Sequence, residues 1–195
     1  MTTENNTAGL DSPNLIDDNS LDIALETKLD VDSVIIQVEK LAERQRQITA
    51  KVQIPHPVEK VWKILTDYEA LPQFIPNLAK SCLLDHPNGG IRLEQIGSQR
   101  LLNFKFCARV VLDLEEIFPK LINFQMVEGD FKGFSGCWSL EPYTFGTSQC
   151  TNLCYTIQVW TKLTMPIAII EKRLSKDLQL NLLAIRQRAN ELSNA

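Results

Sequence analysis

Two cysteines, Cys150 and Cys154, have the residue type and close spacing of a metal-ligand pair. They lie in a stretch that alternates like a β-strand, where four residues span about 13 Å along one face. Two thiolates on one zinc ion, each about 2.3 Å from it, must lie far closer together. Cys82, Cys107 and Cys137 have no cysteine or histidine at metal spacing. We therefore expect structural cysteines and no metal, and the odd number of cysteines argues against a disulfide framework.

Groups for acid–base chemistry are equally sparse. His56 lies between two prolines and His86 precedes a proline in a turn sequence, so we expect both on solvent-facing loops. Glu115 and Glu116 are adjacent in a strand-like stretch, so their side chains point to opposite faces and cannot work as a pair. No glycine-rich phosphate loop precedes a helix, and no serine sits in a nucleophile elbow. We expect no catalytic residue and no cofactor.

Composition and charge describe an ordinary globular chain. Of its 195 residues, 44% are hydrophobic and 23% are charged, which is enough for one domain with a substantial core. No apolar run approaches the ~20 residues that cross a bilayer, and the first residues lack the features of a secretory signal. We therefore expect a cytoplasmic protein, at most peripheral to a membrane.

The charge is divided unevenly along the chain. Residues 1–32 hold eight acidic side chains and one basic one, while the whole chain has a net charge of -4, so the remainder carries +3. The short basic runs at 43–46 and 186–188 are typical of solvated surface, and no clustered cationic face predicts nucleic-acid binding. We expect residues 1–32 to form an acidic, disordered tail and residues 33–195 to form one domain.

The elements that must position any site are mostly strands. Residues 47–54 alternate strictly between apolar and polar side chains, which indicates a half-buried strand. Further strands are predicted at 79–85, 90–98, 103–117, 121–129, 134–141 and 150–162, joined by turns rich in proline and glycine. Pro57 suits the first turn of a helix, and Pro72 and Pro76 limit the next segment to short helical turns.

One long helix ends the pattern. After Pro166, apolar residues recur at spacings of three and four from Ile167 to Ala189, a stripe of about six turns. The sheet and this stripe can bury their apolar faces only against each other. We therefore predict an α+β fold in which a curved, seven-stranded antiparallel sheet with two short helices wraps round a long C-terminal helix.

Several local motifs resemble the START-like, or helix-grip (SRPBCC), superfamily, and within it the coenzyme Q-binding and polyketide cyclase/dehydrase branch. The resemblance covers about residues 34–190 and is carried by residues 54–62, 65–69, 74–78, 133–142 and 153–157. It implies a cavity between the sheet and the C-terminal helix that binds an apolar molecule such as a quinone, an isoprenoid or another lipid. Fold alone does not select among ligand binding, cyclase chemistry and partner binding.

Residues on the inner faces of the strands and of the long helix, with two more near one mouth, are candidates for lining such a cavity, although filling a core is the more common role for any one of them. They are Trp62, Phe74, Phe104, Phe106, Phe124, Met126, Trp138, Tyr155, Ile170, Leu174 and Leu178. A buried polar side chain, Tyr155 or Asn123, is a candidate for orienting a quinone carbonyl.

Three functions follow from these observations. The first is non-catalytic binding or transport of a hydrophobic small molecule, with transient membrane contact. The second is a cyclase- or aromatase-type enzyme, which needs a polar residue with a shifted pKa deep in the cavity. The third is a protein-interaction module that uses the acidic tail or a sheet edge, with partners that the sequence does not identify. The missing catalytic groups favour the first.

Overall fold

The computed structural model describes residues 33–101 and 104–193, together with their side chains except for those of residues 99–106. The chain divides into two units, Met1–Val31 and Asp32–Ala195. The acidic tail expected at residues 1–32 lies outside the described residues, and the description that follows concerns the second unit.

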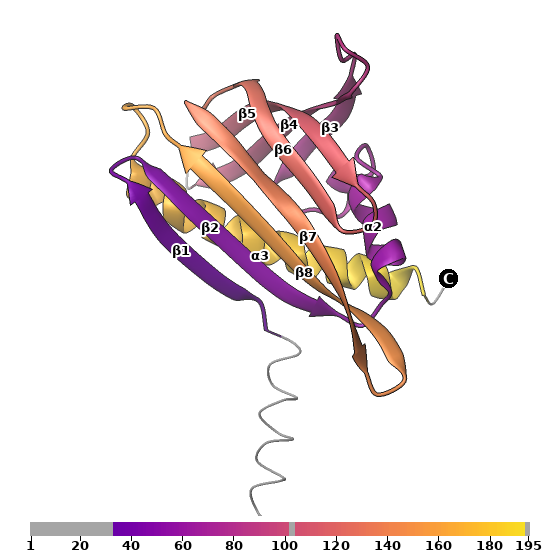
Figure 1. Cartoon of the computed structure of the whole chain (residues 1–195). Helices are drawn as coiled ribbons and strands as arrows, with labels where there is room; N and C mark the ends of the chain where they lie inside the picture. Colours follow the sequence, from indigo (N-terminus) through magenta and orange to yellow (C-terminus); the bar gives the residue numbers. More distant parts are fainter. Residues whose placement is uncertain (1–32, 102–103, 194–195) are drawn as a thin grey trace, which may run out of the picture. The chain divides into compact units, whose positions relative to one another are not determined.

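A single antiparallel sheet dominates this unit and curves around the C-terminal helix (Figure 1). Its strands lie in the spatial order β1-β2-β8-β7-β6-β5-β4-β3, so β3 to β8 form a meander and β2 joins it at β8. The strands are β1 (Ile35–Ala42), β2 (Gln45–Ile54), β3 (Leu78–Leu84), β4 (Ile91–Leu101), β5 (Phe104–Ile117), β6 (Leu121–Gly129), β7 (Gly133–Phe145) and β8 (Ser148–Trp160).

The sheet has eight strands, where the alternation of side chains predicted seven. The additional strand is β1, which pairs with β2 along the edge of the sheet. Most of its residues are exposed on both faces, so it lacks the alternation by which a half-buried strand is recognised. β7 also extends past the turn expected at Pro142, and its hairpin with β8 closes at Gly146, whose φ is +61°.

The helices follow the expected order but differ in one detail. The helix α2 (Val58–Thr66) begins after Pro57, and the long helix α3 (Ile167–Glu191) begins after Pro166. The second short helix is only a single 3₁₀ turn, η1 (Leu71–Gln73). The prolines at 72 and 76 explain this, since each lacks an N–H for a helical bond and constrains the preceding residue.

The core lies between the inner face of the sheet and α3. On β2, Ile48, Ala50, Val52 and Ile54 are all buried, as their alternation predicts. From α3, the stripe that includes Ile170, Leu178, Leu182, Ile185 and Ala189 faces them. The helix crosses the hollow side of the sheet in Figure 1, and this arrangement positions the cavity.

Close packing accompanies the curvature at Gly136 on β7. A Cβ atom at this position would lie 2.0 Å from the Thr156 carbonyl oxygen and 2.6 Å from the Phe124 ring. Only glycine fits here, because the neighbouring backbone and the inner aromatic ring occupy the space of a side chain.

Candidate ligand-binding cavity

A cavity of about 200 Å³ lies between the inner face of the sheet and α3. Its wall is mainly aliphatic, with side chains from β4, β5, β6 and β8 opposite those from α3. The aliphatic residues of the wall are Leu65, Leu71, Ile75, Leu78, Leu93, Ala108, Val110, Leu112, Leu114, Ile122, Ile157, Ile170, Leu174, Leu178 and Ile185. Apolar side chains thus leave a space unfilled in a region where protein interiors are normally close-packed.

Five aromatic rings form a continuous chain along the sheet side of the wall. Phe131 stacks on Phe134 and Phe134 on Phe124, each pair with ring centroids 5.7 Å apart. Phe124 contacts Tyr155 at 6.1 Å, and Tyr155 stacks almost parallel to Trp138 at 3.6 Å. All five rings line the cavity, so it offers an extended surface for a flat or apolar molecule.

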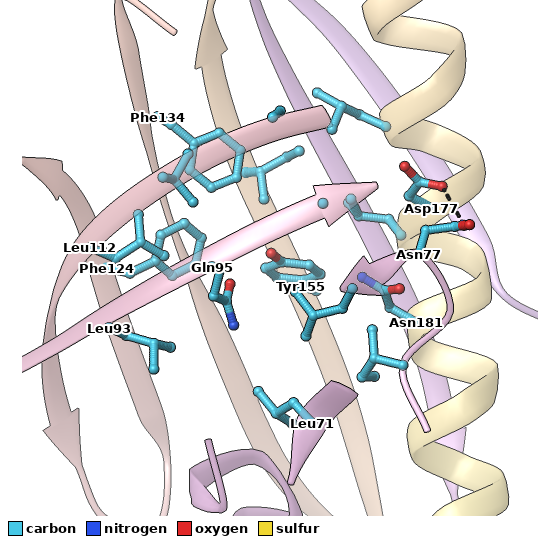
Figure 2. A pocket seen from close by; sticks show the side chains of 18 of the residues that line it. Leu71, Asn77, Leu93, Gln95, Leu112, Phe124, Phe134, Tyr155, Asp177 and Asn181 are labelled. Atoms are coloured by element: carbon cyan, nitrogen blue, oxygen red, sulfur yellow. Dashed lines mark hydrogen bonds between the residues drawn. The ribbon is translucent and has the colours of Figure 1, made fainter. Parts of the chain in front are cut away.

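Polar side chains interrupt this apolar wall at several positions, among them Gln95, Tyr155 and Asn181 (Figure 2). Gln95 donates a hydrogen bond from Nε2 to the Ser81 hydroxyl at 3.3 Å. The Oδ1 atom of Asn181 is buried and has no hydrogen-bond partner among the described residues. A buried acceptor without a partner is rare in proteins and indicates a place where a ligand or water can donate a hydrogen bond.

Tyr155 supplies the complementary donor. Its ring is held by Trp138 and Phe124, and no described residue makes a hydrogen bond to its hydroxyl. Burial raises the pKa of Tyr155 far above its usual value, with a smaller contribution from the nearby Cys137. The hydroxyl therefore stays protonated at neutral pH and can donate a hydrogen bond, but it is a poor base.

A second tyrosine lies at the end of the cavity near α2. The Tyr68 hydroxyl donates to Oε1 of Glu116 at 2.5 Å, and the side chain is buried. Burial and this hydrogen bond to a carboxylate raise the pKa of Tyr68. Because its hydroxyl already donates to Glu116, Tyr68 contributes its ring to the cavity wall but offers no free donor to a ligand.

Polar residues from two elements meet at the exposed end of the cavity. Asn77, which precedes β3 with a φ of +64°, donates from Nδ2 to Oδ1 of Asp177 on α3 at 3.2 Å, the dashed bond in Figure 2. Asn77 is exposed, and Arg173 lines the cavity one helical turn before Asp177. This Asn77–Asp177 bridge marks where the cavity meets the surface.

The structure distributes the eleven sequence candidates among three locations. Six line the cavity: Phe124, Trp138, Tyr155, Ile170, Leu174 and Leu178. The side chains of Phe104 and Phe106 lie outside the described residues. Trp62, Phe74 and Met126 do not line the cavity.

Each of these three side chains packs elsewhere. Trp62 of α2 contacts the Phe118 ring edge-to-face, with ring centroids 5.4 Å apart. The guanidinium of Arg188 lies over the Phe74 ring, 5.8 Å from the ring centroid. Met126 sits beside an irregularity in the β5–β6 pairing, with its sulfur against the backbone of Gly129.

Other sequence expectations are also corrected. Asn123 lies on the outer face of the sheet and donates to Glu115 at 3.0 Å, so it cannot reach a ligand inside. The histidines belong to loops but are not free there. His56 bonds to Asn190 at 2.8 Å, and His86 lies 3.3 Å from Asp113. Each imidazole thus has a partner on another element of the fold.

Several residues of the wall were not among the candidates predicted from the sequence. Phe134 lies four residues before Trp138 on β7, so both side chains point to the inner face. The alternation of that strand could therefore have predicted Phe134 as a wall residue. Phe131 lies in a turn sequence, where alternation gives no information. Gln95 and Asn181 are polar residues on otherwise apolar faces, and only the fold shows that these faces enclose a space.

Comparison with known proteins identifies the family. Residues 54–183, about two thirds of the chain, match the family model described as polyketide cyclase/dehydrase and lipid transport. The chain belongs to this family. The matched segment contains every lining residue of the cavity except Ile185.

Individual known proteins are only distantly similar to the chain. The ribosome association toxin RatA of Rickettsia prowazekii is 23% identical over 94 residues, which cover 48% of this chain and 64% of that protein, so the match spans less than two thirds of it. A START superfamily protein from Mycobacterium smegmatis superposes with a TM-score of 0.62 at 19% identity, over 75% of this chain and 98% of that one. Zhui aromatase/cyclase from Streptomyces sp. R1128 superposes with a TM-score of 0.60 at 17% sequence identity, over 75% of this chain and 94% of that one. These structures share the START-like fold.

Neither a metal-ligand cluster nor a membrane-spanning helix is found in the described part of the chain. Within residues 33–101 and 104–193, no group of three or more His, Cys, Asp or Glu side chains is arranged to hold a metal ion. In the same part of the chain, no helix has the length and apolarity needed to span a bilayer.

Proposed function

We propose that this protein binds a hydrophobic small molecule in the cavity and releases it unchanged. The observation that carries the proposal is the aromatic chain from Phe131 to Trp138, which borders an unfilled space of about 200 Å³ in an otherwise packed core. A ligand that enters gains about 2.5 kcal/mol for each 100 Å² of apolar surface removed from water. The family description, which includes lipid transport, supports the same assignment.

The polar side chains specify the kind of ligand further. The Tyr155 hydroxyl is a donor, and the Asn181 amide offers an acceptor in the same cavity. A ligand carbonyl would accept a hydrogen bond from Tyr155, and a ligand hydroxyl would donate one to Asn181. A quinone with an apolar tail supplies the carbonyl, and an isoprenoid with a hydroxyl head supplies the hydroxyl. Such ligands reside in membranes, so we also propose that the protein contacts a membrane transiently to exchange its ligand.

The test uses the fluorescence of Trp138, which forms part of the wall. A short-chain ubiquinone should quench the tryptophan emission of the full-length protein in a saturable way, and native mass spectrometry should show one bound molecule. Ala108→Phe places a ring in the cavity and should weaken binding at least tenfold. Ala79→Phe makes the same change at an exposed position of β3 and should bind like the wild type.

Two results would contradict binding in the cavity. One is a wild-type protein that takes up neither the quinone nor any lipid recovered from its expression host. The other is equal binding by the wild type and the correctly folded Ala108→Phe variant. Circular dichroism and thermal unfolding of both variants establish folding independently of the ligand.

A cyclase- or aromatase-type enzyme is a second candidate, favoured by a buried tyrosine with a raised pKa inside the cavity. The Tyr155 hydroxyl could donate a hydrogen bond to a carbonyl that becomes more negative as a ring closes. The similarity to an aromatase/cyclase structure concerns the fold. Mass spectrometry of a poly-β-ketone thioester incubated with the protein tests this candidate, because cyclisation with dehydration removes one water per ring. A Tyr155-dependent loss of water would replace the binding proposal.

A further inference from the structure

Three connections of the chain meet at one end of the sheet (Figure 1). The strand register places the β1–β2 turn beside the end of β8, because Gln45 pairs with both Ala42 and Trp160. Trp160 also pairs with Gly133, where the β6–β7 turn ends. We call the turns 43–44 and 130–132, together with residues 160–176, the Trp160 end.

Large apolar side chains are exposed at the Trp160 end. Leu163, in the segment between β8 and α3, is 77% exposed, and Ile169 in the first turn of α3 is 53% exposed. Trp160 is 44% exposed on the outer face of the sheet. Exposed apolar side chains that gather at one end of a domain mark a candidate surface for contact with a protein or a membrane.

The segment that carries Leu163 is held in place. The Arg44 guanidinium donates to the carbonyl oxygens of Lys162, at 2.5 Å, and of Met165. The Thr161 N–H donates to the Arg44 carbonyl at 3.1 Å. The exposure of Leu163 is therefore built into the fold by Arg44.

Cationic residues outnumber acidic ones at the Trp160 end. The Trp160 end contains six cationic and three acidic residues, an excess of three positive charges. Of the acidic ones, Glu171 is paired with Arg46 at 2.5 Å, and Asp130 accepts a hydrogen bond from the backbone N–H of Arg109 at 2.7 Å. The Lys132 ammonium lies over the Trp160 ring, 5.2 Å from its centroid.

The Trp160 end adjoins the exposed end of the cavity. Ile169 precedes Arg173, which lines the cavity, by about one helical turn. On the sheet side, cavity-lining Gly97 pairs with Ala108, and Val110 pairs with Gly129 immediately before the 130–132 turn. A surface that docked at the Trp160 end would therefore lie beside the entrance at Asn77 and Asp177.

We propose that the Trp160 end docks on an anionic membrane surface, with Leu163 and Ile169 entering the interface and the lysines contacting lipid headgroups. Tryptophan beside lysine is favoured at a bilayer interface, where the ring sits at headgroup depth and the ammonium reaches the phosphates. The positive excess matches the negative surface of anionic lipids. The inference deepens the proposed function and rests on it, since docking would bring the cavity entrance to the membrane that supplies its ligand.

Co-sedimentation of the full chain with vesicles tests the proposal. Mixed phosphatidylcholine–phosphatidylglycerol vesicles should bind the protein, pure phosphatidylcholine vesicles should bind it far less, and about 0.5 M salt should weaken the binding. Leu163→Asp should lower the affinity at least tenfold, and Lys132→Glu with Lys162→Glu should do the same. Phe145→Asp makes a comparable change at a side chain that is 63% exposed in the β7–β8 hairpin, away from the Trp160 end, and should leave binding unchanged.

Equal loss from Leu163→Asp and Phe145→Asp, or no preference for anionic vesicles, would overturn the docking surface. Docking of an acidic protein instead of a lipid surface would appear as the absence of vesicle binding even at low salt, and this too would overturn it. Quinone titration of Leu163→Asp without vesicles separates the two proposals. If the wild type docks but takes up no quinone, the ligand assignment fails; if the variant takes up quinone normally and still docks like the wild type, the surface assignment fails.

Discussion

At the scale of single residues, the inner wall combines apolar surface with very few polar groups. Tyr155 and Asn181 differ from the other polar side chains of the wall because no described residue satisfies the hydroxyl of one or the carbonyl of the other. In a packed core this arrangement would be destabilising. It is consistent with a site that is completed by a ligand.

Tyr155→Phe tests this interpretation. We expect the affinity for a short-chain ubiquinone to fall about five- to tenfold, as for the loss of one hydrogen bond, while the affinity for a hydrocarbon of similar size stays the same. The free energy of unfolding should be unchanged or higher, because the hydroxyl has no partner to lose. Fluorescence titration and urea unfolding measure the two quantities, and a large loss of stability would contradict the assignment.

A different residue, Glu94 on the outer face of the sheet, makes the free energy of unfolding depend on pH. Hydrogen bonds from Lys80 and from Arg109 lower the pKa of Glu94 from 4.5 to about 2. Because the pKa is lower in the folded state, the stabilisation is fully present above pH 4.5 and disappears as the pH falls towards 2.

Glu94→Gln should therefore be less stable than the wild type near pH 7, and the difference should disappear near pH 2. Urea unfolding at several pH values measures it. Glu128→Gln is the matched control, because Glu128 also contacts Arg109, at 2.6 Å, but is 68% exposed and should matter less. A difference between Glu94→Gln and the wild type that does not vary with pH would show that the ion pairs are not its source.

At the scale of elements, strand alternation predicted most of the sheet and the stripe predicted α3. Alternation did not predict β1, whose two faces are similarly exposed. The prolines predicted short helical turns after α2, and the structure has the single turn η1 there. Alternation also cannot show how strongly a sheet bends. At Gly136, the backbone of β8 and the ring of Phe124 approach closely because the sheet bends there. This close approach brings the aromatic rings of β6 and β8 near each other.

Gly136→Ala should consequently destabilise the protein by about 1–3 kcal/mol, because the new methyl group meets backbone atoms that cannot rotate away. Gly133→Ala is the matched control on the same strand. Its Cβ would lie 3.7 Å from its nearest neighbour, Trp160, so the stability should change by less than about 0.5 kcal/mol. Thermal or urea unfolding compares the two, and equal effects would argue against the packing at Gly136.

At the scale of the whole molecule, the cavity couples ligand binding to stability. A ligand that binds only the folded chain stabilises it by about 2.7 kcal/mol at a hundredfold excess over its Kd. For a chain of this length this corresponds to an increase in Tm of about 5–10 °C. Differential scanning calorimetry with and without the quinone should show the shift in the wild type and in Ala79→Phe. Its presence in Ala108→Phe would place the ligand outside the cavity.

The sequence by itself determined which faces are apolar, that one long helix packs against an antiparallel sheet, and which family the motifs resemble. These properties depend on local alternation and helical periodicity, so neighbouring residues suffice to establish them. Only the tertiary structure decided that Trp62, Phe74 and Met126 lie away from the cavity, whereas Phe131, Phe134 and Asn181 line it. An empty space is bounded by residues far apart in the chain, and its location depends on how far the sheet bends away from α3. The same holds for the Trp160 end, where two turns and the segment 160–176 come together from distant parts of the chain.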